Sequence, residues 1–197
     1  MPYETPFRIA LLLALVVFVT IRVTYRVKLH TPRRPLSASQ DIPAIRLFLG
    51  VLGILGFGPP VWLINPNWLG AAAIGLPDWA RWSGAGMAVA GLALLAWAHQ
   101  TLGANFNTLL TLQTQHQLIT TGPYRWVRHP MYSAIVLWEL GVALITANAL
   151  VVALPLAFAL FFILRVAPEE AMMAKAFGDP YQSYRQRTGR FVPRLLP

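Results

Sequence analysis

The sequence from residue 131 to residue 166 is MYSAIVLWELGVALITANALVVALPLAFALFFILRV, and this stretch decides the fold. It contains two apolar runs, Met131 to Ala147 and Leu150 to Val166, which are joined by little more than Asn148. A transmembrane helix needs about 20 residues to cross a hydrocarbon core of about 30 Å, so each run is nearly long enough. The two runs predict a tight helical hairpin in a membrane, with a mild bend at Pro155.

Three further apolar stretches precede this hairpin, over Phe7 to Val23, Ile42 to Ile64 and Trp79 to Ala98. The second contains Gly56 and Pro60 and is expected to be kinked or broken. Apolar residues make up 56% of the chain and charged residues only 12%, which is not the balance of a soluble domain. We therefore predict an all-α polytopic membrane protein with about five transmembrane helices and a cytoplasmic C-terminal helical segment.

The chain has a net charge of +9, and the placement of its basic residues predicts the orientation of these spans. Basic residues cluster between the first and second stretches and again after the fifth, and such clusters face the cytoplasm. The N-terminus is then outside, while the C-terminus and the polar half are cytoplasmic. We expect the first stretch to be a retained span rather than a signal peptide, because its positive cluster follows it. Topology and membrane lipids account for the charge without nucleic acid, and a bacterial inner (cytoplasmic) membrane is the expected location.

Polar side chains are concentrated after Ala98, so residues 1–98 are predicted to be a three-span scaffold and residues 99–197 a catalytic half of one integrated domain. The chain has no cysteine, which excludes thiolate ligands and a cysteine nucleophile. His99 and His116 match no spacing of metal ligands, so no metal site is predicted.

The sequence Arg128-His129-Pro130 predicts the start of the fourth span, because proline is favoured at the first turn of a helix. A helix start with two basic side chains favours an anion such as a carboxylate. The alternative is that Arg128 and His129 only anchor the helix at the lipid headgroups.

At the end of the fifth span, Arg165 and Glu169 share a face only if the helix continues across Pro168. A simple ion pair at the membrane interface is the alternative to a functional role. Glu170 is expected on a different face, in contact with solvent.

An ionisable side chain inside a span is a functional hypothesis, and Glu139 is in the fourth span. It could contact a polar group of a substrate, bond to a neighbouring helix or line a water-filled tunnel. Further along, a helix is expected to stop at Gly178 and the next to begin with Asp179 as its cap. This amphipathic element could cover a site, but surface packing is the expected role.

Taken together, the polar motifs from Leu102 to Pro193 resemble those of the isoprenylcysteine carboxyl methyltransferase family, within the broader group that includes phospholipid methyltransferases. The motifs that carry the resemblance are Asn105-Phe106-Asn107, His116-Gln117-Leu118-Ile119-Thr120, Gly122-Pro123-Tyr124, Arg128-His129-Pro130-Met131-Tyr132, Trp138 with Gly141, Arg165 with Glu169-Glu170, and Phe177-Gly178 with Tyr181 and Tyr184. The resemblance implies an S-adenosylmethionine site between the cytoplasmic ends of the last spans and the C-terminal segment.

What the resemblance implies for single residues is a cofactor-binding set and a substrate-binding arginine. The cofactor-binding set is His116, Gln117, Leu118, Ile119, Tyr124, His129, Pro130, Met131, Tyr132 and Glu169. Arg165 would engage the substrate, and either Thr111 or Gln113 would supply a further polar contact to the cofactor. Ala134 and Glu139 depart from the family pattern, which often has glycine at the first position and is not usually acidic at the second.

The expected activity is O-methylation of the carboxylate of a lipophilic, isoprenylcysteine-like substrate, which needs no general base. An amine of a phospholipid or a small thiol is the alternative acceptor, and for an amine Glu139 is the candidate base. A nicotinamide-dependent membrane reductase or a non-enzymatic membrane scaffold would also be consistent with the sequence. The oligomeric state cannot be predicted, because the small residues from Gly84 to Gly91 suit packing within one chain or between chains.

Overall fold

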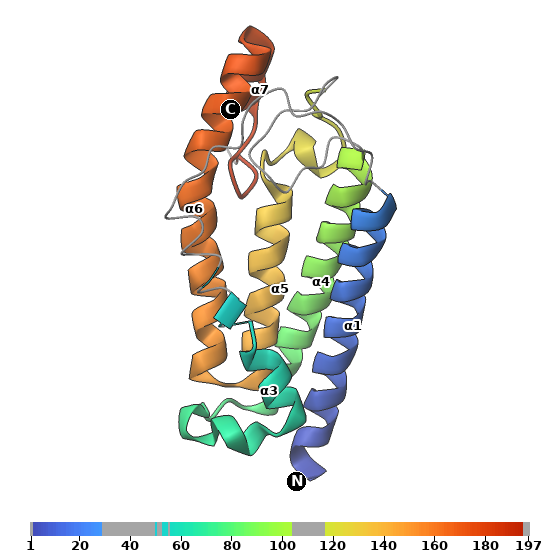
Figure 1. The fold of residues 1–197 in the computed structure, drawn as a ribbon, viewed down its shortest axis with the longest axis vertical. Helices are drawn as coiled ribbons and strands as arrows, with labels where there is room; N and C mark the ends of the chain where they lie inside the picture. The colour runs from blue at the N-terminus through green and yellow to red at the C-terminus, as the bar shows by residue number, and fades with distance from the viewer. Residues whose placement is uncertain (1, 29–49, 51–52, 55, 104–116, 195–197) are drawn as a thin grey trace.

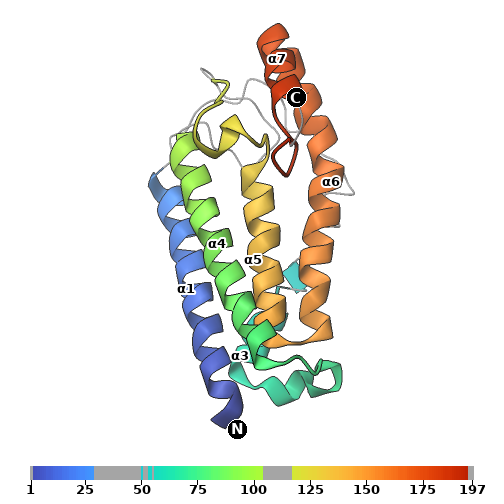
Figure 2. The ribbon, with the colours of Figure 1, turned by 180° about the vertical axis from the view of Figure 1, so that it is seen from behind.

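The computed structural model describes residues 2–28, 50, 53–54, 56–103 and 117–194. Within these ranges every named element is a helix. Four long helices form the body of the molecule: α1 (Thr5–Lys28), α4 (Asp78–Leu102), α5 (Pro130–Thr146) and α6 (Ala149–Phe177). Figures 1 and 2 show them side by side with nearly aligned axes.

Short elements lie at the two ends of this bundle. The 3₁₀ helix η1 (Pro2–Glu4), the helix α3 (Gly58–Ile64) and the 3₁₀ helix η2 (Pro66–Ala72) lie at one end, which we call the α3 end. The 3₁₀ helix η4 (Gly122–Arg125) and the helix α7 (Asp179–Arg187) lie at the opposite end, which we call the α7 end.

Among the described residues, three helices are long and apolar enough to cross a membrane: residues 5–25 of α1, all of α4 and all of α6. Helix α5 is also apolar but has only 17 residues. The protein is therefore an integral membrane protein with an all-helical fold. The prediction of about five spans stays a prediction, because most of the stretch from Ile42 to Ile64 lies outside the described residues and its described end is the seven-residue α3.

The predicted hairpin is confirmed, and Asn148 forms its turn. Helix α5 ends before Ala147, whose backbone is left-handed at φ 45°, and the Asn148 side chain accepts a hydrogen bond from Leu150 N at 3.1 Å. Helix α6 then continues through Pro155 and Pro168 to Phe177. At about 1.5 Å per residue it is about 43 Å long, so its last turns extend beyond a hydrocarbon core of about 30 Å.

Helices α4 and α5 pack with their backbones in direct contact. A Cβ atom added to Gly141 would lie 2.5 Å from Ala88 N and 2.6 Å from Gly84 O, and one added to Gly91 would lie 2.7 Å from Trp138 N. Only glycine fits at such distances. The small residues of α4 are therefore used for packing within the chain. The predicted boundary between residues 98 and 99 falls inside α4 and remains a prediction.

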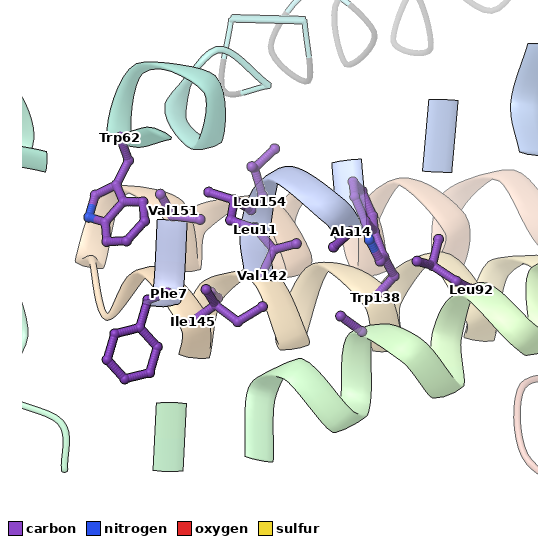
Figure 3. Packing of buried hydrophobic residues seen from close by; sticks show 12 residues of the cluster. Phe7, Leu11, Ala14, Trp62, Leu92, Trp138, Val142, Ile145, Val151 and Leu154 are labelled. Carbon is purple, nitrogen blue, oxygen red and sulfur yellow. The ribbon is translucent and has the colours of Figure 1, made fainter. Parts of the chain in front are cut away.

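The largest core cluster lies toward the α3 end and joins α1, α3, α4, α5 and α6. Figure 3 shows Phe7, Leu11 and Trp62 among its members. The buried Arg81 of α4 closes this end of the bundle, because it donates to Ile145 O at 2.9 and 3.0 Å and pairs with Glu4 at 2.6 Å. Its guanidinium also lies 3.6 Å from the centre of the Phe7 ring.

Candidate functional site

The start of helix α5 is held by the C-terminal segment that follows α7. Pro130 is the first residue of the helix, as predicted. Arg128 N donates to Gly189 O at 2.9 Å, His129 N donates to Arg190 O at 3.1 Å, and the Ser133 hydroxyl donates to Phe191 O. Residues 189–191 therefore lie against the start of α5 and accept hydrogen bonds around its first turn.

Glu170 is the central charged group at this end. Its side chain is 5% exposed. Its carboxylate lies 2.9 Å from Arg128 Nε, 3.4 Å from His129 Nε2 and 3.1 Å from Arg190 Nη2. The prediction that Glu170 is solvated is therefore wrong. Because α6 continues across Pro168, Glu170 lies one turn after the buried Val166 and faces the bundle.

This arrangement gives Arg128 and His129 a carboxylate partner within the chain. Arg128 Nη1 also donates to Thr188 O and to Arg185 O. The start of α5 was predicted to attract a carboxylate, and a carboxylate does lie beside Arg128 and His129. It belongs to Glu170 of the same chain and not to a ligand. That the pair binds the carboxylate of a cofactor stays a prediction.

A second polar cluster joins α5 and α6 through Tyr132, Arg165 and Glu169. The Tyr132 hydroxyl donates to Glu169 Oε2 at 2.6 Å, and Arg165 Nε lies 3.9 Å from the same oxygen. The predicted shared face of Arg165 and Glu169 is confirmed. The Tyr132 ring is stacked between His129 at 5.3 Å and Phe162 at 4.1 Å, so it links the two polar clusters.

Not all of the predicted cofactor-binding residues are in these clusters. Ile119, Tyr124 and Met131 pack with Leu95 and Ala98 of α4 in an apolar cluster. Pro130 is buried at the start of α5, Gln117 is exposed and Leu118 is half-buried. His116, Thr111 and Gln113 lie outside the described residues.

Helix α7 covers part of this end with two tyrosines. Helix α6 stops at Gly178, whose φ of 55° favours glycine, and α7 begins at Asp179 itself, so Asp179 is the first helical residue rather than the predicted cap. Tyr181 and Tyr184 are buried on one face, and the Tyr184 hydroxyl donates to Tyr124 O at 2.7 Å. Burial raises the pKa of Tyr184, and it raises the pKa of Tyr181 to about 12, so both phenols are neutral at neutral pH.

Glu139 lies in neither cluster. It is on α5, seven residues after Tyr132, and is 5% exposed. Its Oε2 atom has no hydrogen-bond partner among the residues described by the structure. The described ranges also contain no group of three His, Cys, Asp or Glu side chains that could hold a metal ion.

Sequence reasoning missed the role of Glu170, although a signal for it was present. The segment from Arg128 to Arg194 has six arginines but only three acidic residues besides the intramembrane Glu139. This excess of arginines over carboxylates is the signal that one carboxylate is shared by several arginines. What was lacking was the continuity of α6 through Pro168, which sets the face on which Glu170 lies.

The fold and this end of it define an integral membrane protein with clustered ionisable side chains where its last two long helices meet the C-terminal segment. Residues 84–175 match the family model of the isoprenylcysteine carboxyl methyltransferase (ICMT) family. This region contains the cluster of Tyr132, Arg165 and Glu169 as well as Glu170. The resemblance seen in the motifs is thus confirmed for residues 84–175, which are similar to that family.

Similar proteins carry the same family name. The chain is 38% identical over 96 residues to a protein-S-isoprenylcysteine O-methyltransferase of Tribolium castaneum. The aligned region covers 47% of this chain and 34% of the relative. It is 34% identical over 122 residues to the Homo sapiens enzyme of that name, covering 60% of this chain and 42% of the relative. The chain thus spans about a third to two fifths of the length of these two relatives.

A solved structure shows the same relation in three dimensions. The eukaryotic intramembrane Ras methyltransferase ICMT matches with a TM-score of 0.55 and 28% sequence identity. The match covers 78% of this chain and 53% of that chain. It therefore extends beyond the matched family region and includes part of the helical scaffold.

Proposed function

We propose that this protein is an integral-membrane methyltransferase that uses S-adenosylmethionine to O-methylate the carboxylate of a lipophilic, isoprenylcysteine-like substrate. The observation that carries the proposal is the contact of Tyr132, Arg165 and Glu169 within the region that matches the family model. These side chains come from two different helices. They offer an acid, a cation and an aromatic face at one place.

The chemistry of these side chains fits the cofactor. S-adenosylmethionine carries an ammonium group and a sulfonium group, both positively charged. Glu169 is 27% exposed and accepts a hydrogen bond from Tyr132, and a carboxylate has lone pairs for further donors. The Tyr132 ring adds an aromatic face of the kind that attracts cations. Glu169 would hold the ammonium, and Tyr132 would orient Glu169.

Arg165 is the residue proposed to bind the substrate. When bound, S-adenosylmethionine supplies an electrophilic methyl group, and a carboxylate acceptor is already ionised at neutral pH. No general base is then required, so the protein contributes mainly proximity and alignment. The Arg165 guanidinium, 3.9 Å from Glu169, would fix the acceptor carboxylate next to the cofactor. A lipophilic substrate would reach it from the bilayer between the helices.

The direct test uses purified protein in lipid vesicles with methyl-labelled S-adenosylmethionine and a prenylated cysteine analogue. Base-labile, volatile label is expected, because a methyl ester releases methanol in base. Base-stable label in lipid headgroups would show an amine acceptor and would overturn the carboxylate proposal. Binding of a reduced nicotinamide without affinity for S-adenosylmethionine would show a reductase instead.

Calorimetry with S-adenosylhomocysteine tests the site separately from the acceptor. Glu169→Ala and His129→Ala should weaken binding about tenfold or more, because each removes a contact made by a charged or aromatic group. Asp179→Ala is the matched control, since Asp179 is exposed at the start of α7 and should leave the affinity unchanged. No measurable binding by the folded wild type would favour a non-enzymatic scaffold.

We also propose that the α7 end is cytoplasmic and the α3 end is outside, in a bacterial inner membrane. The chain has no cysteine, so single cysteines can be introduced for labelling. Asn67→Cys at the α3 end and Arg187→Cys at the α7 end are both exposed positions. A membrane-impermeant maleimide added to intact cells should label the first and not the second, and the reverse pattern would overturn this orientation.

A further inference from the structure

The two faces of α5 are packed in different ways. Toward α4 the backbones touch at Gly141, so nothing can enter between these helices. Toward α6 the contact is made by large aromatic side chains, among which Tyr132 stacks on Phe162 and Phe162 packs against Phe158. Aromatic side chains can change rotamer, whereas backbone contacts cannot separate without moving a helix. A lipophilic molecule would therefore enter on the α6 side of α5.

Glu139 lies on this α6 side, deeper in the membrane than the polar clusters. Seven residues span about 10 Å along a helix and nearly two full turns, so Glu139 shares a face with Tyr132. Tyr132 contacts Glu169, which lies beside Arg165 at the α7 end. Glu139 thus lies about 10 Å from Tyr132 along the axis of α5, on the side away from the α7 end.

One oxygen of the buried Glu139 carboxyl group has no hydrogen-bond partner among the described residues. This oxygen is Oε2, and the side chain is 5% exposed. Its neighbours on the helix Val142 and Ala143 are buried and apolar, and the indole Nε1 of the buried Trp138 has no hydrogen-bond partner among the described residues either. Burying a carboxyl group without a partner lowers stability, and an apolar residue would avoid that cost. A buried carboxyl oxygen without a partner at this position is explained if a bound ligand donates the missing hydrogen bond to it.

We infer that Glu139 is a specificity-determining residue that accepts a hydrogen bond from a donor group, a hydroxyl or an ammonium, within the lipophilic part of the substrate, about 10 Å from the methylated carboxylate. This inference rests on the proposed function. The distance of about 10 Å is the axial offset between Tyr132 and Glu139 on α5. The preferred substrate then shares the carboxylate and the lipophilic chain of an isoprenylcysteine but also carries a hydrogen-bond donor along that chain.

The test compares three lipophilic carboxylates of equal length in the vesicle assay. One has a plain hydrocarbon chain, one has a hydroxyl about 10 Å from the carboxylate, and one has an amine there. The wild type should methylate at least one donor-bearing compound with a kcat/KM about tenfold or more above that of the hydrocarbon compound. In Glu139→Leu this preference should fall to within about twofold.

Two further variants sharpen the result. Glu139→Gln keeps an acceptor oxygen but cannot ionise to pair with an ammonium, so it should retain a preference for the hydroxyl compound and lose one for the amine. Leu140→Ala, at a 39% exposed position on the next residue, should leave the preference unchanged. Binding of S-adenosylhomocysteine, measured by calorimetry, should be equal in all variants and shows that each is folded.

The outcomes separate this inference from the function on which it rests. Equal preferences in the wild type and Glu139→Leu, or no preference in the wild type, would overturn the role of Glu139 and leave carboxylate methylation standing. Absence of ester from every compound would overturn the proposed acceptor, and the role of Glu139 with it.

Discussion

Replacing Glu170 with alanine is the perturbation for which the structure makes the sharpest prediction. Glu170 is 5% exposed, and its two oxygens lie within 3.4 Å of Arg128, His129 and Arg190. Removing the carboxylate leaves Arg128, with 8% of its side chain exposed, without its acidic partner. The start of α5 and the segment after α7 would then lose the group that joins them to α6.

The magnitude follows from the burial of this pair. Removing one member of a buried ion pair costs about 3–5 kcal/mol, because the other charge stays buried. Arg128 still donates to the carbonyls of Thr188 and Arg185, so the lower end of this range applies. A loss of about 3 kcal/mol in the free energy of unfolding corresponds to a fall of roughly 6–12 °C in Tm for a chain of this size.

The assay is thermal unfolding of the purified protein in detergent, with the wild type and two comparison variants. Glu170→Gln keeps the shape and one acceptor oxygen and should lose less stability than Glu170→Ala. Lys175→Ala, at an exposed position of the same helix, should stay within about 0.5 kcal/mol of the wild type. A Tm of Glu170→Ala equal to that of Lys175→Ala would refute the assignment of Glu170 as a buried charged centre.

Three other substitutions test separate parts of the structure. Gly141→Val should lower Tm by more than about 5 °C, since a Cβ there meets the α4 backbone at 2.5 Å; a Tm unchanged from the wild type would contradict this packing. Tyr132→Phe should weaken binding of S-adenosylhomocysteine about three- to tenfold in calorimetry, because Glu169 loses a 2.6 Å hydrogen bond, while Tm changes little. Arg81→Leu should destabilise the α3 end by about 3 kcal/mol, as Glu4 loses its partner, without changing that affinity.

Much of the fold could be predicted from the sequence because the bilayer imposes simple rules. Apolar length gave the positions of α1, α4, α5 and α6 to within a few residues, apart from the extension of α6. Pro130 marked the start of α5, and Asn148 marked the turn before α6. Each of these signals is local, so it needs no knowledge of which helices are neighbours.

The site was less predictable because its contacts join distant parts of the chain. The pair of Arg165 and Glu169 is four residues apart and followed from helical spacing once α6 was continuous. The contacts of Glu170 with Arg128 and with Arg190 join residues that are 42 and 20 positions apart in the sequence. Helical periodicity predicts contacts only between residues three or four positions apart, so it could not predict these. The sequence also does not predict that the backbone carbonyls of residues 189–191 accept hydrogen bonds from the start of α5.

The adjacent residues Glu169 and Glu170 show how stability and the proposed chemistry are connected. Successive residues of a helix point about 100° apart, so the two carboxylates face different partners. Glu170 is bound by Arg128 and His129 and thereby fixes the rotation of α6 against α5. That rotation places Glu169 within 2.6 Å of the Tyr132 hydroxyl. Glu170→Ala should therefore weaken both folding and cofactor binding, whereas Tyr132→Phe should weaken binding alone, and this difference separates a residue that positions the site from one that belongs to it.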